Sequence, residues 1–150
     1  ADLDVIYDVE KFEKAASVAE RLPVGDPRKL FALNEAINLY GGQFLNDVPS
    51  LWATERRRQL EIRYLDLISE QALEALARDQ PRRAIESLRR GLSVDPLRDD
   101  LNIRYLEALG RLGQVSEVSA HYLHYTRLIR EELGIDPPEA IRELYARLIS

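Results

Sequence analysis

Three side chains between residues 115 and 133 have the types and spacing of a metal site. Glu117, His121 and His124 stand at positions i, i+4 and i+7, so on a helix they share one face. Carboxylate and imidazole groups are common ligands of zinc and other first-row metals. No fourth ligand is apparent, and the three residues flank the apolar residues Val118 and Tyr122. We interpret them as the polar flank of a packed helix and expect no metal site.

Paired carboxylates, which could serve acid–base catalysis, occur at Asp99-Asp100 and at Glu131-Glu132. Adjacent residues on a helix point about 100° apart, so neither pair converges on one substrate atom. The chain contains no cysteine, which excludes a thiolate nucleophile and disulfides. It also has no nucleophile elbow, phosphate-binding glycine loop or calcium loop. We therefore predict that the protein is not an enzyme and needs no cofactor.

Two arginine pairs form the most regular basic pattern. Arg82-Arg83 and Arg89-Arg90 lie one heptad apart with Glu86 between them, so a helix would align them along its surface. This pattern is typical of a solvated helix face. The alternative is a contact with phosphate or with an acidic partner.

The run from Arg56 to Arg58 is less regular, because three consecutive helical residues spread over too wide an arc to form one face. Glu55 and Glu61 are nearby candidates for ion pairs. The net charge of the chain is −5, and no segment has the basic excess that binding to phosphates requires. We therefore do not expect this chain to bind duplex DNA by itself.

The elements that would position these residues are helices. Apolar residues recur at helical spacing, and Asp-Pro at 95–96 and 136–137 interrupts the pattern, because proline cannot continue a helix but fits the first turn of the next. The pattern predicts an all-α fold, a tetratricopeptide-like array of about seven antiparallel helices. The expected helices cover residues 9–21, 27–40, 51–78, 81–92, 97–112, 115–133 and 140–148.

Two local expectations concern the first third of the chain. Residues 1–7 alternate enough to suggest a short strand, with Asp8 as the N-cap of the first helix. Gly41-Gly42 is expected to end the second helix, since glycine accepts the left-handed C-cap conformation. Trp52, near Phe44 and Leu45, is expected to be a core or helix-docking residue.

The chain also fits a helical-repeat frame. Counted back from Pro96, residues 65–98 match the 34-residue tetratricopeptide repeat in part, with Ala84, Leu88 and Gly91 at its small, large and small packing positions. If this frame holds, one groove should present partner-binding residues from two repeats. These are Asp66, Glu70 and Leu73 from the first repeat, and Asp100, Ile103, Arg104, Glu107 and Arg111 from the second.

An ordered set of short motifs extends over nearly the whole chain. It begins with residues 40–45 (Tyr-Gly-Gly-Gln-Phe-Leu), Asp47, Trp52 and Arg56. It continues with residues 95–99 (Asp-Pro-Leu-Arg-Asp), Ala108, Leu109, Gly113, Tyr122, Arg127, residues 132–134 (Glu-Leu-Gly), Pro137, Leu144 and Tyr145. In order and spacing the set resembles the bacterial transcriptional activator domain of regulators of the Streptomyces antibiotic regulatory protein type.

The resemblance implies a non-catalytic protein-interaction and activation module of a bacterial transcription regulator. Such a module would support self-association, signal relay or contact with the transcription machinery. Its expected partner is a protein, either a component of RNA polymerase or a second copy of itself. In that family the domain follows a winged-helix DNA-binding domain, so DNA would be contacted only through a preceding domain. The alternative is a standalone tetratricopeptide-type adaptor that binds peptide segments outside transcription.

The expected domain organisation follows from the same resemblance. Residues 1–8 would be the tail of a linker to an absent N-terminal DNA-binding domain, and residues 9–150 would form the helical activator domain. The chain has no methionine, so we expect Ala1 to be an internal position of a longer protein. No apolar run approaches the roughly 20 residues that span a bilayer, and we expect no membrane association and a cytoplasmic location.

Overall fold

The computed structural model describes the backbone of residues 2–40 and 51–150 and the side chains of residues 6–40 and 54–150. Within these ranges it contains seven helices and no strand, which confirms the predicted all-α array. The chain divides into two compact units, Ala1–Glu74 and Ala75–Ser150, and each unit has buried apolar residues of its own. Gly41, Gly42, Phe44, Leu45 and the side chain of Trp52, all named above, lie outside the described parts.

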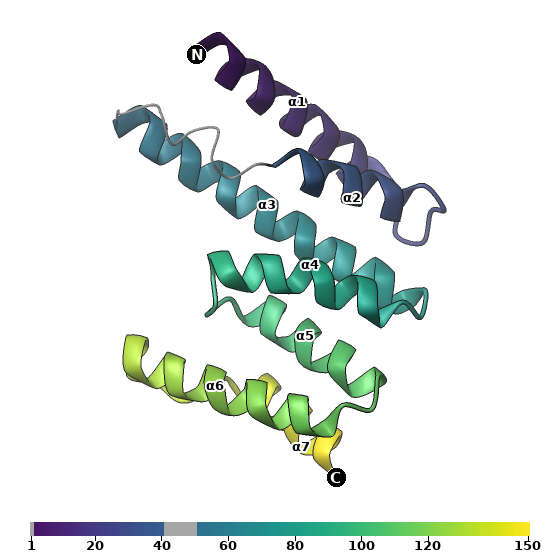
Figure 1. Cartoon of the computed structure of the whole chain (residues 1–150), viewed down its shortest axis with the longest axis vertical. Coiled ribbons are helices and arrows are strands. Elements are labelled where there is room, and N and C mark those ends of the chain that lie inside the picture. Colours follow the sequence, from purple (N-terminus) through teal and green to yellow (C-terminus); the bar gives the residue numbers. More distant parts are fainter. Residues whose placement is uncertain (1, 41–50) are drawn as a thin grey trace. The chain divides into compact units, whose positions relative to one another are not determined.

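The first unit is built from three helices, α1 (Asp2–Arg21), α2 (Lys29–Leu39) and most of α3 (Leu51–Ala77). Helices α1 and α2 pack side by side (Figure 1). The stripe of apolar residues predicted along α3 is buried throughout its described part, including Leu60, Leu67 and Ile68. Tyr40 stacks on Tyr64 of α3 with ring centroids 4.1 Å apart, so the end of α2 is held against α3.

The strand expected in residues 1–7 is wrong, because α1 begins at Asp2. Ile6 and Tyr7 are exposed and face no partner strand among the described residues. An isolated strand leaves its backbone groups unpaired, whereas each residue added to an existing helix gains a hydrogen bond. Helix propagation therefore prevails over a short alternating pattern, and α1 continues across the expected boundary between residues 8 and 9.

The second unit contains α4 (Pro81–Val94), α5 (Asp99–Arg111), α6 (Val115–Leu133) and α7 (Glu139–Ile149). Helix α5 packs against α4, α6 and α7, so it forms the centre of this unit (Figure 1). The turn after α5 uses Gly113 at φ 70°, and α6 ends at Gly134 at φ 66°, both in the left-handed region that favours glycine. The helix ends predicted near residues 112 and 133 are therefore confirmed.

The apolar residues that recur at helical spacing along α6 are buried only in the middle of the helix. Val118, Tyr125 and Ile129 are buried, whereas Val115 and Leu133 at the two ends are exposed. Helix α6 has 19 residues and its neighbour α5 has 13, so at 1.5 Å per residue α6 extends about 9 Å beyond what α5 can cover. Leu133 is exposed for this reason, because it lies at the end of α6 away from the turn that joins α5 to α6.

Candidate partner-binding surfaces

The second set of predicted partner-binding residues lies together on one face of α5. Asp100, Ile103, Arg104 and Glu107 are half-buried, and Arg111 is exposed. Their spacing along the helix places them in one row. The row carries two acidic groups, two basic groups and one apolar side chain, a mixture suited to a protein partner that offers both signs of charge.

Asp100 and Arg111 at the two ends of this row have contacts within the protein. Asp100 forms an ion pair with Arg98, with 2.9 Å between Oδ1 and Nε, and accepts a hydrogen bond from the N–H of Leu101 at 3.0 Å. Its carboxylate lies in the first turn of α5, where the helix dipole favours negative charge. Arg111 donates from Nη1 to the carbonyl oxygen of Leu76 at 2.5 Å, so it anchors the end of α5 to the last turn of α3.

The first predicted set belongs to the first unit. Asp66 and Leu73 are exposed and Glu70 is half-buried, and they share one face of α3 by their spacing. The structure thus brings each set together on its own helix, in separate units. The single groove expected from the repeat frame stays a prediction.

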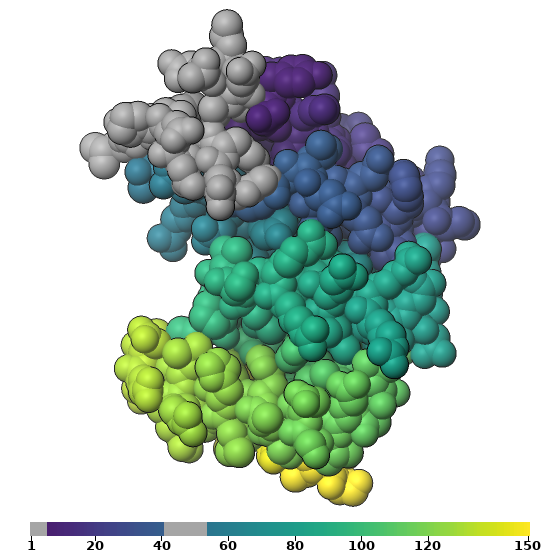
Figure 2. All heavy atoms as spheres, in the orientation of Figure 1, coloured from purple at the N-terminus to yellow at the C-terminus, as the bar shows by residue number. Residues whose placement is uncertain are grey.

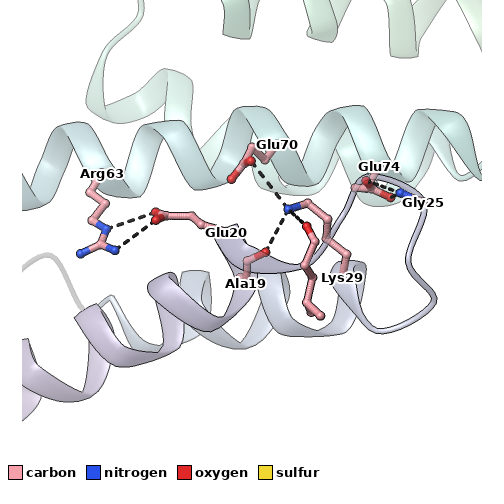
Figure 3. Close-up of polar contacts among 8 residues, drawn as sticks. Ala19, Glu20, Gly25, Lys29, Arg63, Glu70 and Glu74 are labelled. Atoms are coloured by element: carbon pink, nitrogen blue, oxygen red, sulfur yellow. Dashed lines mark hydrogen bonds and ion pairs between the residues drawn. The ribbon is translucent and has the colours of Figure 1, made fainter.

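Glu70 takes part in a polar cluster around a buried lysine (Figure 3). Lys29, at the start of α2, is only 3% exposed. Its ammonium donates to the carbonyl oxygens of Ala19 at 2.9 Å and Leu22 at 2.8 Å, near the end of α1, and lies 3.8 Å from Oε1 of Glu70. Burial raises the pKa of Glu70, and the charge of Lys29 acts against that rise. Glu70 therefore has a contact inside the first unit besides any contact with a partner.

Glu74, one helical turn beyond Glu70, holds the loop between α1 and α2. Its side chain is buried, and Oε1 accepts the backbone N–H of Gly25 at 3.0 Å (Figure 3). Gly25 has a φ of +87°, a conformation that side chains with a Cβ rarely adopt. Sequence reasoning missed Lys29 and Glu74. For Lys29 a signal was available, since it falls on the same helical face as Leu33 and Ala36.

Two arginines of α3, Arg56 and Arg63, form ion pairs with carboxylates of α1. Arg56 contacts Glu13, which corrects the expectation that Glu55 or Glu61 would serve as its partner. Arg63 binds Glu20 in a forked arrangement, with Nε to Oε1 at 3.2 Å and Nη2 to Oε2 at 3.1 Å (Figure 3). A carboxylate on a facing helix can accept hydrogen bonds from two N–H groups of one guanidinium. This forked pairing is favoured over an ion pair with a residue that is merely nearby in the sequence.

His121, the most plausible metal ligand by sequence, has a structural contact. Its Nε2 lies 2.8 Å from Oδ1 of Asn102, a buried residue of α5 whose Nδ2 donates to the carbonyl oxygen of Arg98 at 2.9 Å. Burial, helped by the nearby His124, lowers the pKa of His121 to about 4. In the described part of the chain, no group of three or more His, Cys, Asp or Glu residues is placed to hold a metal ion.

The arginine pairs of α4 are all exposed, as the solvated-face interpretation requires. Arg89 donates from Nε to the hydroxyl of Tyr105 on α5 at 3.3 Å, which positions its guanidinium. Among the described residues, no helix combines the length and the apolar character needed to cross a membrane.

Comparison with known proteins adds evidence independent of this geometry. The family model of the bacterial transcriptional activator domain matches residues 7–149. The chain is 31% identical over 149 residues to the regulatory protein AfsR of Streptomyces griseus, which covers 99% of the chain and 15% of that relative. It is 31% identical over 146 residues to AfsR of Streptomyces coelicolor, covering 95% of the chain and 14% of the relative. The chain thus spans about a seventh of the length of these relatives.

Proposed function

Because the chain belongs to the bacterial transcriptional activator domain family, we propose that it is a non-catalytic protein-interaction module of a transcription regulator. The module supports self-association, signal relay or contact with the transcription machinery. Its partner is a component of RNA polymerase or a second copy of itself. DNA is contacted through another domain of the regulator, in the cytoplasm.

One observation carries this proposal, the mixed-charge row on α5. Ile103, Arg104 and Glu107 are half-buried, so they are held by their neighbours yet still reach solvent. A surface of this kind loses little side-chain entropy when it binds, because the side chains are already partly ordered. It also carries both acidic and basic groups, and each can pair with an opposite charge on a partner, which gives a protein contact its register and specificity.

A reporter assay tests the proposal. The chain is fused to a heterologous DNA-binding domain whose operator precedes a reporter gene in Streptomyces. We expect Arg104→Glu and, separately, Glu107→Lys to lower activation about fivefold or more, as loss of an interface residue does. Arg142→Glu on α7 is the matched control, since Arg142 is exposed outside this row and undergoes the same charge reversal as Arg104.

Two measurements accompany the reporter assay. Circular dichroism melts check that each variant folds, and sedimentation checks whether the chain self-associates. Unchanged activation by both α5 variants would show that this face is not the contact surface. A fusion that neither activates nor self-associates would favour the alternative, a peptide-binding adaptor that acts outside transcription.

A further inference from the structure

A hollow lined by arginines lies on the second unit, where α4 begins and α5 ends. One part of it has a volume of about 520 Å³ and is lined by Asp79, Pro81, Arg82, Arg83, Arg111 and Leu112. A second part, of about 350 Å³, is lined by Arg82, Ile85, Glu86, Arg89, Leu112 and Gln114. Arg82 and Leu112 belong to both parts, so the two form one continuous surface, which we call the arginine hollow.

The charge of the arginine hollow is opposite to that of the chain. Four guanidinium groups line it against only two carboxylates, those of Asp79 and Glu86, whereas the whole chain carries a net charge of −5. A local excess of positive charge in a cleft attracts anionic groups from solution. The arginine hollow therefore has the electrostatics of a site for an anionic partner.

The spacing of the arginines indicates what kind of anion fits. Arg82 and Arg89 are seven residues apart on α4, so they lie on one face at about 10 Å from each other along the helix axis. A single phosphate is too small to contact both. In an extended peptide the side chains alternate between two faces, with a rise of about 3.3 Å per residue. Carboxylates four residues apart therefore share a face at about 13 Å, and the long, flexible arginine side chains can reach both of them. Each fork can bind one carboxylate through two hydrogen bonds.

Between these arginines the arginine hollow has an apolar floor. Ile85 is 6% exposed and Leu112 is half-buried, and both line the surface beside Arg82. Arg89 is positioned by its hydrogen bond to Tyr105, which reduces the entropy lost on binding. An apolar side chain placed between two acidic residues of a ligand would rest on this floor. Figure 2 shows the side chains of α4 and of α6 on one face of the second unit.

We propose that the arginine hollow binds an extended acidic segment of a protein partner, with two carboxylates four residues apart and an apolar residue midway between them. This proposal rests on the proposed role as an interaction module, but the arginine hollow shares only Arg111 with the row on α5, and neither binding test substitutes Arg111. Failure of the α5 test therefore leaves it standing, and its own failure leaves the α5 contact untouched.

Fluorescence anisotropy tests the proposal on the 150-residue chain at physiological salt. The probe is a labelled synthetic peptide of glutamate and aspartate around a central leucine. The comparison peptide has glutamine and asparagine in their place. We expect the acidic peptide to bind and the amide peptide not to bind, because the guanidinium forks require charged acceptors.

Matched variants locate the site. Arg82→Gln with Arg89→Gln should weaken binding of the acidic peptide about tenfold or more, since two charge-assisted contacts are lost. Arg142→Gln with Arg147→Gln on α7 removes the same charge from positions outside the hollow and should change binding less than about twofold. Asp79→Asn should tighten binding, and asparagine tolerates the φ of 56° at this position.

Four results would overturn the proposal. Equal weakening by the α7 control would mean that only overall charge matters. Binding of the amide peptide would exclude carboxylate recognition. Competition by inorganic phosphate at the same concentration as the peptide would indicate an ion site. Tighter binding of duplex DNA, lost in the Arg82/Arg89 variant, would make the surface a nucleic-acid site. Circular dichroism melts confirm that every variant is folded.

Discussion

The ammonium of Lys29 lies 3.8 Å from the carboxylate of Glu70, so a residue whose spacing predicts partner binding also forms an ion pair inside the first unit. Glu70 shares its helical face with Asp66 and Leu73, which are exposed. Substitutions at Glu70 will therefore mix an effect on stability with any effect on binding. Leu73, which is exposed, is the better probe of that face.

Lys29 itself is predicted to matter more for stability than its ion pair. Lys29→Met keeps the length and apolar stem of the side chain but leaves the carbonyl oxygens of Ala19 and Leu22 without this donor. We expect a loss of about 2 kcal/mol in the free energy of unfolding. Glu70→Gln should cost less than about 1 kcal/mol, because its carboxylate is 40% exposed. Urea denaturation measures both, and equal losses would contradict this assignment.

Gly25 is predicted to resist substitution because of its backbone conformation. Its φ is +87°, and a Cβ added there would meet no atom within 4 Å, so the cost is conformational and not steric. We expect Gly25→Ala to lower the free energy of unfolding by about 1 kcal/mol. Gly25→Asn should cost less, since asparagine visits positive φ more readily. Thermal melts of the two variants test this, and the reverse order would refute the conformational explanation.

His121 is predicted to make stability depend on pH. Its pKa in the folded state is about 4, below the usual value of 6.5, so the unfolded chain binds the proton more tightly. Its contribution is therefore fully present above pH 6.5 and is lost as the pH falls toward 4, by on the order of 2–3 kcal/mol. In His121→Gln the new side chain can still donate to Asn102. We expect the melting temperature of this variant to change less with pH between these values.

The control for His121 is its neighbour on the same helix. His124 is exposed, so His124→Gln should leave most of the pH dependence of the wild-type chain in place. If both variants show the same dependence as the wild type, other titrating groups cause the loss of stability in acid.

Arg111 is predicted to combine a structural role with a place in the arginine hollow. Arg111→Gln removes the hydrogen bond to the carbonyl oxygen of Leu76, and we expect a loss of about 1 kcal/mol in the free energy of unfolding. Arg82→Gln, at another exposed arginine of the hollow, serves as the comparison and should cost less. Denaturant titration distinguishes them. Equal stability of the two variants would show that the contact with Leu76 contributes nothing.

Most of the fold could be predicted because it is specified by local signals. Apolar residues at helical spacing, with proline and glycine between them, place six of the seven helix starts and most of the buried residues. The error at residues 1–7 has a physical cause, since a short alternating segment has no means of its own to choose between helix and strand. The exposed end of α6 at Leu133 was also missed, because burial there depends on the length of a neighbouring helix.

The candidate site divides in the same way. Sequence alone placed Asp100, Ile103, Arg104, Glu107 and Arg111 on one helical face, since this follows from 3.6 residues per turn. The tertiary structure decided which charges are paired, because Lys29 meets Glu70, and Arg56 meets Glu13, across helices packed at a particular height and rotation. Helical periodicity fixes the direction in which a side chain points around the helix axis. Which partner that side chain reaches depends on how the neighbouring helices pack. For that reason the chain's helices and faces could be predicted from its residues, while its ion pairs and the arginine hollow could not.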